Sequence, residues 1–127
     1  HNSGLQELFQ RNCATMMGES SVLVMPARRN RGGSTDMGDL SQIIPSCHPY
    51  TSGAVGAGHS KEYLITDYES AVVNPAKIMA MVAIDLLSDG AAKGNEVISN
   101  HRPAMKKDAY LRFQRERAEV IEYDGSR

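Results

Sequence analysis

The stretch NPAKIMAMVAIDLL, residues 74–87, decides the fold that the sequence predicts. Asn74 and Pro75 are typical of a helix start, because asparagine caps the first amides and proline fits the first helical position. Only two of the following twelve residues, Lys77 and Asp85, are not apolar. A helix that is apolar all round is normally buried. The sequence therefore predicts a helix that needs cover on more than one side.

A second helix is predicted near the start of the chain. Ser3 can cap it, with Gln6 reaching back in a capping-box pattern, and Gly18 is a typical stop. The residues expected on its apolar face are Leu5, Leu8, Phe9, Cys13 and Met16. Val22–Met25 then forms a short apolar run ended by proline, which indicates a buried strand.

The second half of the chain is predicted to be helical around a linker. The glycine-punctuated segment 88–96 is expected to be that linker, and a charged helix is expected over 103–121. Asp108 and Arg112 can pair on this helix at i,i+4 spacing. Its narrow apolar stripe consists of Met105, Ala109, Phe113 and Val120.

The order of these elements is typical of an α/β fold. Helix, strand, loop, extended segment, helix and helix follow one another, yet a complete sheet needs about four strands and one is clear here. We therefore expect the C-terminal portion of a mixed-sheet domain with helices on its faces, with an incomplete sheet in this chain. The absence of an initiator methionine fits either a small domain or a piece of something longer.

Bulk composition excludes few functions. The 127 residues are 41% hydrophobic and 23% charged, with a formal net charge of −1, so no electrostatic case exists for nucleic acid or for an anionic membrane surface. No apolar run approaches the ~20 residues of a membrane span, and nothing resembles a signal peptide. Cys13 and Cys47 are too few for a disulfide framework, so we expect reduced thiols in a cytoplasmic protein.

The glycine-rich segment RGGSTDMGD, residues 31–39, is the first candidate site. Its glycines let a backbone approach a ligand, and Ser34 and Thr35 offer hydroxyl groups. Gly33, Ser34, Thr35 and Asp36 are therefore candidate substrate-binding residues. No Gly-Lys-Ser/Thr follows, so this is not a phosphate-binding P-loop. A polar turn with a helix-capping aspartate is the structural alternative.

His59, in the segment GAGHSKEY at residues 56–63, is the candidate metal ligand. Small neighbours leave its ring accessible, and Glu62 and Asp67 follow it. No H-E-x-x-H or C-x-x-C motif accompanies it, although a zinc site needs three or four ligands. The residues thus indicate one candidate ligand and no complete site, and a surface histidine in a turn remains the alternative. His48 is expected to be a buried histidine and His101 a solvated one.

Taken together, the motifs over residues 33–87 resemble one family. They are G-S-T-D-M-G-D at 33–39, I-I-P at 43–45, H-P-Y at 48–50, G-H-S at 58–60 and the apolar helix. This order and spacing is similar to the C-terminal part of the catalytic domain of the dinuclear-zinc amidohydrolases related to aminoacylase and carboxypeptidase G. Within that family, the branch of aminobenzoyl-glutamate hydrolases is the most similar. About half of the chain carries the resemblance.

The resemblance implies a division of the chain and a role for each part. Residues 1–30 would be the helix and strand that re-enter the catalytic domain after a lid domain. Residues 31–73 would be active-site loops, 74–88 a buried helix, and 89–127 a linker and outer helix. His59 would be the last metal ligand, with the segment from Gly33 to Asp36 on the substrate side.

The resemblance also implies an activity, a cofactor and partners. The complete enzyme would hydrolyse an amide bond of an N-acyl amino acid, aminobenzoyl-glutamate or a small peptide. Two divalent ions would activate the attacking water; zinc is the expected metal, with manganese or cobalt as the alternatives. The other ligands and the catalytic glutamate lie elsewhere in such enzymes, so we expect this chain alone to be inactive. It would belong to a cytoplasmic homodimer that includes a lid domain. A non-catalytic α/β binding or structural module that kept the family's shape is the alternative.

Overall fold

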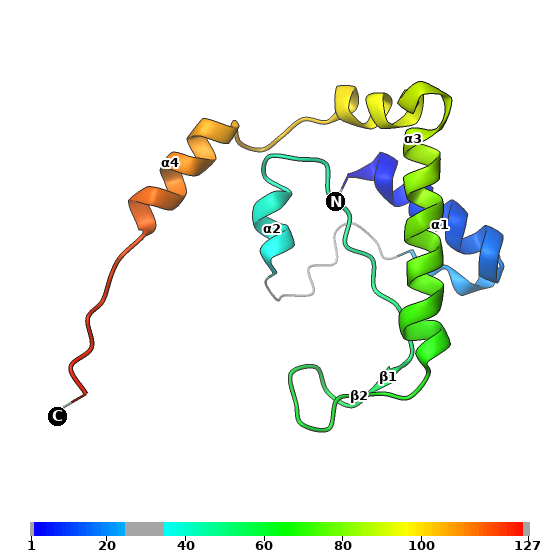
Figure 1. Cartoon of the computed structure of the whole chain (residues 1–127), viewed down its shortest axis with the longest axis horizontal. Coiled ribbons are helices and arrows are strands. Elements are labelled where there is room, and N and C mark those ends of the chain that lie inside the picture. The colour runs from blue at the N-terminus through cyan, green and yellow to red at the C-terminus, as the bar shows by residue number, and fades with distance from the viewer. Residues whose placement is uncertain (1, 25–34, 126–127) are drawn as a thin grey trace.

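The computed structural model describes residues 2–24 and 35–125, and one long helix dominates it (Figure 1). In chain order the elements are α1 (Ser3–Met17), the 3-10 turn η1 (Glu19–Ser21), α2 (Asp36–Leu40), β1 (Ala54–Val55), β2 (Leu64–Ile65), the π-helical turn η2 (Glu69–Val73), α3 (Asn74–Asn100) and α4 (Lys107–Arg117). Helix accounts for 59% and strand for 4%. The α/β prediction is therefore wrong, since the described part is mostly helical with a two-stranded hairpin.

Helix α1 forms where the sequence predicts it, with its cap one residue earlier. The Asn2 side chain, rather than that of Ser3, accepts a hydrogen bond from the Leu5 amide at 3.0 Å. Gly18 ends the helix at φ 88°, and its N–H donates to the Ala14 carbonyl. The predicted apolar face is confirmed: two of its residues are buried and three half-buried, in the order Leu8, Cys13, Leu5, Phe9 and Met16.

The buried strand predicted at Val22–Met25 is wrong where the structure describes it. The turn η1 follows α1, and residues 22–24 have no regular structure. The Leu23 side chain is 82% exposed, while Met25 lies outside the described residues. A strand exists only when a neighbouring strand takes its backbone hydrogen bonds. None of the described segments pairs with residues 22–24, so their apolar composition alone did not produce a strand.

Helix α3 begins with a wider turn and contains a break. The π-helical turn η2 precedes Asn74, whose N–H donates to the Glu69 carbonyl. This turn lies where a regular helix would press the ring of Pro75 against the carbonyl four residues earlier. The predicted start at Asn74 is thus too late, because the helical path already runs through η2. The Asp67 carboxylate, and not Asn74, provides the capping interaction.

The segment predicted as a linker, 88–96, is only partly irregular. Ser88 is extended, and Asp89, Gly90 and Ala91 all have positive φ, between 52° and 66°. The helix then resumes in a different direction and continues to Asn100 (Figure 1). The sequence correctly indicates a break at Gly90, but the length of the linker is overestimated.

The core lies between α1 and α3. Leu8 is 2% exposed and Ile78 is 1% exposed, and Cys13 and Val97 complete the buried apolar set. Beside it, the Asp85 carboxylate accepts hydrogen bonds from Arg11 at 2.9 Å and from the buried Asn12 side chain at 2.7 Å. These contacts join two helices that are more than seventy residues apart in the chain.

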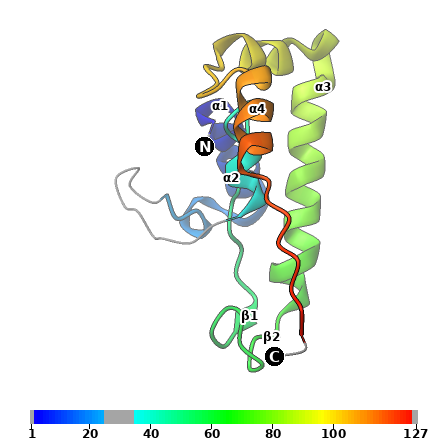
Figure 2. The same ribbon diagram turned by 90° about the vertical axis from the view of Figure 1, so that its left-hand side faces the viewer.

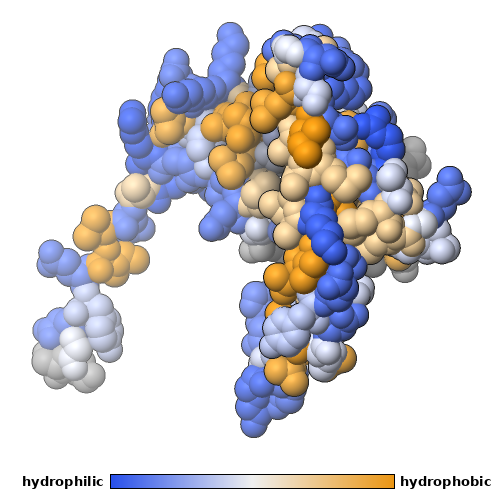
Figure 3. Space-filling view, turned by 45° about the vertical axis from the view of Figure 1, so that its right-hand side comes forward, coloured by the Kyte–Doolittle hydropathy of each residue, from blue (hydrophilic) through white to orange (hydrophobic). Residues whose placement is uncertain are grey.

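The opposite side of α3 is uncovered. Met79 is 65% and Leu87 is 72% exposed, and hydrophobic side chains lie open on the face of the molecule in Figure 3. The prediction that this helix is buried all round is therefore wrong for the described part of the chain. The packed side is the one that faces α1, and the first part of α3 stands apart from α2 and α4 (Figure 2).

The helical path from Glu69 to Asn100 is long and apolar enough to cross a membrane, by length and composition alone. This corrects the sequence-based expectation that no apolar run of that length exists, because η2 extends the helix toward its N-terminus. Length and composition are weak evidence, since core helices of soluble proteins share both.

Helix α4 lies apart from α1 and α3, and an extended segment follows it (Figure 1). Its Gln114 side chain donates a hydrogen bond to the Asp39 carboxylate of α2 at 3.3 Å. It is shorter than the predicted 103–121, because residues 118–124 are not helical. The Phe113 ring lies 4.1 Å from the Arg117 guanidinium carbon, and Val120 is 92% exposed. Of the predicted apolar stripe, Met105 and Ala109 are half-buried, whereas Phe113 and Val120 are exposed. The ion pairs in the described part do not include Asp108 with Arg112.

Candidate functional site

A small β-hairpin presents His59. Strands β1 and β2 are antiparallel, with Ala54 opposite Ile65 and Val55 opposite Leu64. Two successive turns shape the loop between them, with the Ser60 amide donating to the Ala57 carbonyl. An isolated two-stranded hairpin is marginal in water. Other contacts must therefore hold this one in place.

Two glycines allow close approaches that hold the hairpin, one within it and one to the segment around η2 that leads into α3. At Gly53, φ is 105°, and an added Cβ would lie 2.5 Å from the Asp67 carbonyl oxygen and 2.8 Å from the Ala71 Cβ. The Gly53 carbonyl accepts hydrogen bonds from the amides of Thr66 and Asp67. At Gly56, φ is 87°, and an added Cβ would overlap the Glu62 carbonyl. Only glycine permits both close approaches.

His59 lies exposed in this loop, with its backbone in the left-handed region at φ 63°. Histidine visits this region more readily than most residues, but the conformation still has an energetic cost. Gly58 precedes it, and nothing lies within 4 Å of a Cβ placed there. The structure thus agrees with the accessibility that the small neighbours indicate.

The two acidic residues that follow His59 have other partners. Glu62 forms an ion pair with Lys61 at 3.8 Å, and both side chains are largely exposed, so the pair contributes little to stability. The Asp67 carboxylate accepts hydrogen bonds from the Ser70 hydroxyl at 2.6 Å and from the Ser70 amide at 3.1 Å. These bonds favour the ionised carboxylate and lower the pKa of Asp67.

Within residues 2–24 and 35–125, no group of three or more histidine, cysteine, aspartate or glutamate side chains could hold a metal ion. A catalytic zinc ion typically has three protein ligands. The residues around His59 therefore do not fit a complete metal site, although the imidazole is a suitable single ligand.

The glycine-rich candidate segment is only half described. Gly33 and Ser34 lie outside the described residues. Thr35 caps α2, its side chain accepting a hydrogen bond from the Met37 amide at 3.4 Å, and Asp36 is exposed in the first turn. An acidic residue in the first turn interacts favourably with the helix dipole. The structural alternative was a polar turn with a helix-capping aspartate, whereas the residue that caps the helix is Thr35.

The two candidate segments lie apart. In both Figure 1 and Figure 2, α2 lies near the N-terminal end of α1, whereas the hairpin that carries His59 lies beside the N-terminal end of α3. Thr35 and Asp36 are therefore not brought next to His59 by the described part of the chain.

His48 and Cys47 lie on the extended segment between α2 and β1. The His48 ring stacks on the Tyr50 ring, with centroids 5.2 Å apart and an angle of 21° between the planes. His48 is half-buried, so its expected burial is confirmed only in part. Partial burial raises the pKa of the Cys47 thiol. A raised pKa disfavours the nucleophilic thiolate at neutral pH.

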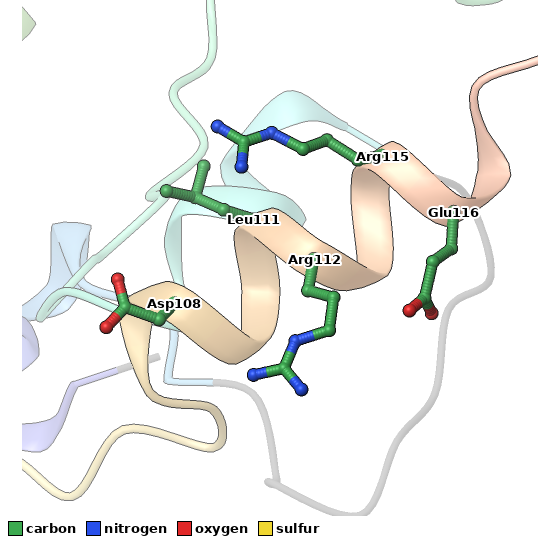
Figure 4. Close-up of a pocket in the computed structure, with 5 residues that line it drawn as sticks. All are labelled: Asp108, Leu111, Arg112, Arg115 and Glu116. Carbon is green, nitrogen blue, oxygen red and sulfur yellow. The ribbon is translucent and has the colours of Figure 1, made fainter.

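A shallow cavity of about 490 Å³ lies along α4. All five side chains that line it come from this one helix (Figure 4): Asp108, Leu111, Arg112, Arg115 and Glu116. Two acidic and two basic side chains line it, so no single charge sign dominates. A surface built from one exposed helix offers little enclosure to a ligand.

A second cavity, of about 290 Å³, lies where the start of α1, the segment after α2 and the end of α3 meet. Sequence reasoning missed it, and took His101 for a solvated residue. His101 is half-buried in the structure, and its Nε2 atom is shielded from solvent without a hydrogen-bond partner in the described part. No local pattern could have revealed this cavity, because its three segments are far apart in the chain.

Comparisons of this chain with protein-family models, with curated proteins and with solved structures found no match.

Proposed function

We propose that this chain is the C-terminal part of a metal-dependent amidohydrolase, in which His59 supplies one metal ligand. The enzyme would hydrolyse an amide bond of an N-acyl amino acid, aminobenzoyl-glutamate or a small peptide. The proposal rests first on the order of the G-S-T-D-M-G-D, H-P-Y and G-H-S motifs along residues 33–60.

The observation that carries the proposal is the way the hairpin holds His59. The imidazole is exposed in a turn with left-handed backbone geometry. Two glycine-dependent close approaches hold the hairpin, that of Gly56 to Glu62 within it and that of Gly53 to the segment leading into α3. Non-glycine residues with strained backbone often occur at functional sites, since ordinary selection for stability would remove the strain. A histidine at an anchored turn is well placed to meet ligands from another segment.

The exposed side of α3 is also consistent with this proposal. A continuous apolar helix face in solvent marks a surface on which something else packs. In the proposed enzyme, the rest of the polypeptide supplies the other metal ligands and the catalytic glutamate. The zinc ions, or other divalent ions in their place, would polarise the amide and activate the water when bound.

The test uses the full-length protein with His59→Ala, and Lys61→Ala as a matched control in the same loop. We expect His59→Ala to lose one bound metal ion and nearly all hydrolysis of N-acyl and peptide amides, because the ligand is gone while the fold persists. Metal content by mass spectrometry, amide hydrolysis with and without chelator, and circular dichroism are measured. Lys61→Ala, whose side chain is 92% exposed, should match the unmodified protein.

Two outcomes contradict the proposal. Full metal content with unchanged hydrolysis in His59→Ala would remove His59 from the site. Failure of the full-length protein to hydrolyse any amide on the panel, even with added zinc, manganese or cobalt, would favour a non-catalytic module. One or two metal ions bound per isolated 127-residue chain would show instead that the site is complete within it.

A further inference from the structure

The 290 Å³ cavity between α1 and α3 is polar and has an unusual charge balance. Its volume corresponds to about ten water molecules at about 30 Å³ each. Only two of its nine lining residues are apolar, and none is acidic. The polar groups on which the argument rests are those of Asn2, Ser3, Ser41, Ser46, His101 and Arg102.

Arg102 is the one lining residue with a permanent charge, and the end of α3 holds it. Its Nη1 atom donates to the Ser99 carbonyl at 2.8 Å and to the His101 carbonyl at 3.0 Å. These bonds use the N–H groups of one nitrogen, so Nε and Nη2 remain as a pair of donors. That pair is the geometry with which arginine binds two oxygens of a carboxylate or phosphate at once.

The anchoring also changes the electrostatics at the end of α3. The last carbonyl groups of a helix carry partial negative charge, which would repel an anion. Arg102 neutralises part of this charge by bonding to the Ser99 carbonyl. Because the guanidinium is already held, less side-chain entropy is lost when it binds a ligand.

The other walls of the cavity provide hydrogen-bond donors. Ser3 is the first residue of α1, and the first amides of a helix lack intrahelical acceptors and carry partial positive charge. The Asn2 side chain accepts a hydrogen bond from the Leu5 amide. The backbone N–H of Asn2 donates to the Ser46 carbonyl at 2.8 Å, which fixes this wall of the cavity. The hydroxyls of Ser41 and Ser46 already donate to the Gly38 and Ile44 carbonyls. The Ser3 hydroxyl is therefore the serine donor that can rotate toward an anion.

His101 adds a nitrogen that the protein leaves without a partner. A buried imidazole nitrogen without a hydrogen bond has an energetic cost. The ring lines the same cavity as Arg102. A small adjustment of the ring would let the nitrogen donate to an oxygen bound there.

We propose that this cavity binds a small oxyanion, a carboxylate or a phosphate group, with Arg102 as the main contact. The shared chemistry is two adjacent oxygens that accept from the Nε and Nη2 donors. The site is far from His59, at the opposite end of the first part of α3 (Figure 1). The proposal therefore does not depend on the amidohydrolase assignment.

The test is a titration of the full chain with phosphate, and separately with acetate, at constant ionic strength. The Nε–H signal of each arginine is followed by NMR. We expect the Arg102 signal to shift saturably, with half-saturation on the order of 1–10 mM, because one exposed ion pair supports only weak binding. The Arg112 signal is the internal control, since that residue lies on α4 outside the cavity.

Two variants complete the test. Arg102→Gln should weaken binding at least ~10-fold, and Arg102→Lys should keep the charge but lose most of the affinity, because lysine lacks the paired donors. A stronger response to phosphate or to acetate identifies which oxyanion the site prefers.

Several results would overturn the proposal. One is the absence of a saturable Arg102 shift up to about 50 mM ligand, well above the expected dissociation constant. Another is an equal shift at Arg102 and Arg112, which would show adventitious association of anions with any arginine. Unchanged affinity in a folded Arg102→Gln variant would also overturn the proposal, because the main contact would then not be Arg102. If that variant does not fold, the shifts of the unmodified chain decide.

Discussion

At the scale of single residues, backbone geometry explains more of the candidate site than side-chain chemistry does. His59 belongs to no group of three or more potential metal ligands in the described residues, yet glycine-dependent contacts hold the hairpin that carries it. Gly53 contributes most to this, because its carbonyl accepts hydrogen bonds from two backbone amides. It also has no side chain, which lets Ala71 pack against its backbone. The position of His59 thus depends on a glycine six residues before it.

Gly53→Ala is predicted to loosen the hairpin. The new Cβ would collide with the Asp67 carbonyl and the Ala71 side chain, and φ of 105° is unfavourable for alanine. We expect a loss of about 1–3 kcal/mol of local stability. It is measured as faster hydrogen exchange of the Thr66 and Asp67 amides, both of which donate to the Gly53 carbonyl.

Gly58→Ala is the matched control for this prediction. A Cβ there meets nothing within 4 Å, and its φ lies outside the left-handed range. Exchange of the Thr66 and Asp67 amides should therefore change by no more than about 0.5 kcal/mol in free-energy terms. Equal effects of the two substitutions would show that steric contact at Gly53 does not hold the hairpin.

At the scale of elements, α3 shows how one helix can combine a strong sequence signal with two irregularities. The π-helical turn at its start and the left-handed turn at residues 89–91 change its direction without ending it. The break allows the second part of α3 to pack Val97 against the first turn of α1, where Gly4 leaves room for it.

Ala91→Gly is predicted to stabilise the protein. Ala91 has φ 62°, and an L-residue with a side chain has an energetic cost there that glycine avoids. We expect a gain of about 0.5–1 kcal/mol in the free energy of unfolding, measured with urea. Ala92→Gly, one residue further and inside the resumed helix, should instead lose about 0.5–1 kcal/mol. A loss in both variants would contradict the left-handed geometry of this turn.

At the scale of the whole molecule, few interactions join distant parts of the chain. The hydrogen bonds of Asp85 with Asn12 and Arg11 stand beside a small apolar core of Leu8 and Ile78. The Asn12 side chain, and secondarily Arg11, lowers the pKa of Asp85 below its ordinary value of 3.8. The ionised form is thus the one that the folded state stabilises.

This linkage predicts a pH dependence of stability. Because the pKa of Asp85 is lower in the folded state, its contribution is present above the unfolded value near 3.8 and is lost as the pH falls below it. In Asn12→Ala the pKa should rise toward the ordinary value, and the loss of stability between about pH 5 and pH 3 should be smaller. Urea unfolding at several pH values, with a carboxyl NMR titration of Asp85, measures both effects.

Asn95→Ala is the control for this experiment. Asn95 is an exposed residue of the second part of α3, so the substitution changes helix propensity without touching Asp85. Its pH profile should follow that of the unmodified protein. An Asn12→Ala profile identical to that of Asn95→Ala would mean that Asn12 does not set the pKa of Asp85.

Some features of the candidate sites depend on neighbouring residues in the sequence, and others depend on residues that are far apart in the chain. The accessibility of His59 was predictable, because it follows from the small residues beside it. A capping turn was one of two interpretations of the segment that contains Thr35, but that interpretation gave the cap to the aspartate that follows it. The cavity around Arg102 was not predictable, since Asn2, Ser46 and Arg102 have no common sequence pattern and meet only in space.

The sequence by itself determined where the main helices form. Caps, glycine stops and the 3.6-residue periodicity act over a few neighbouring residues, so α1 and the first part of α3 were predictable. Only the tertiary structure decided that Val22–Val24 does not become a strand and that one side of α3 stays exposed. The reason is physical: a strand needs a partner for its backbone hydrogen bonds, and an apolar helix face is buried only where another element reaches it.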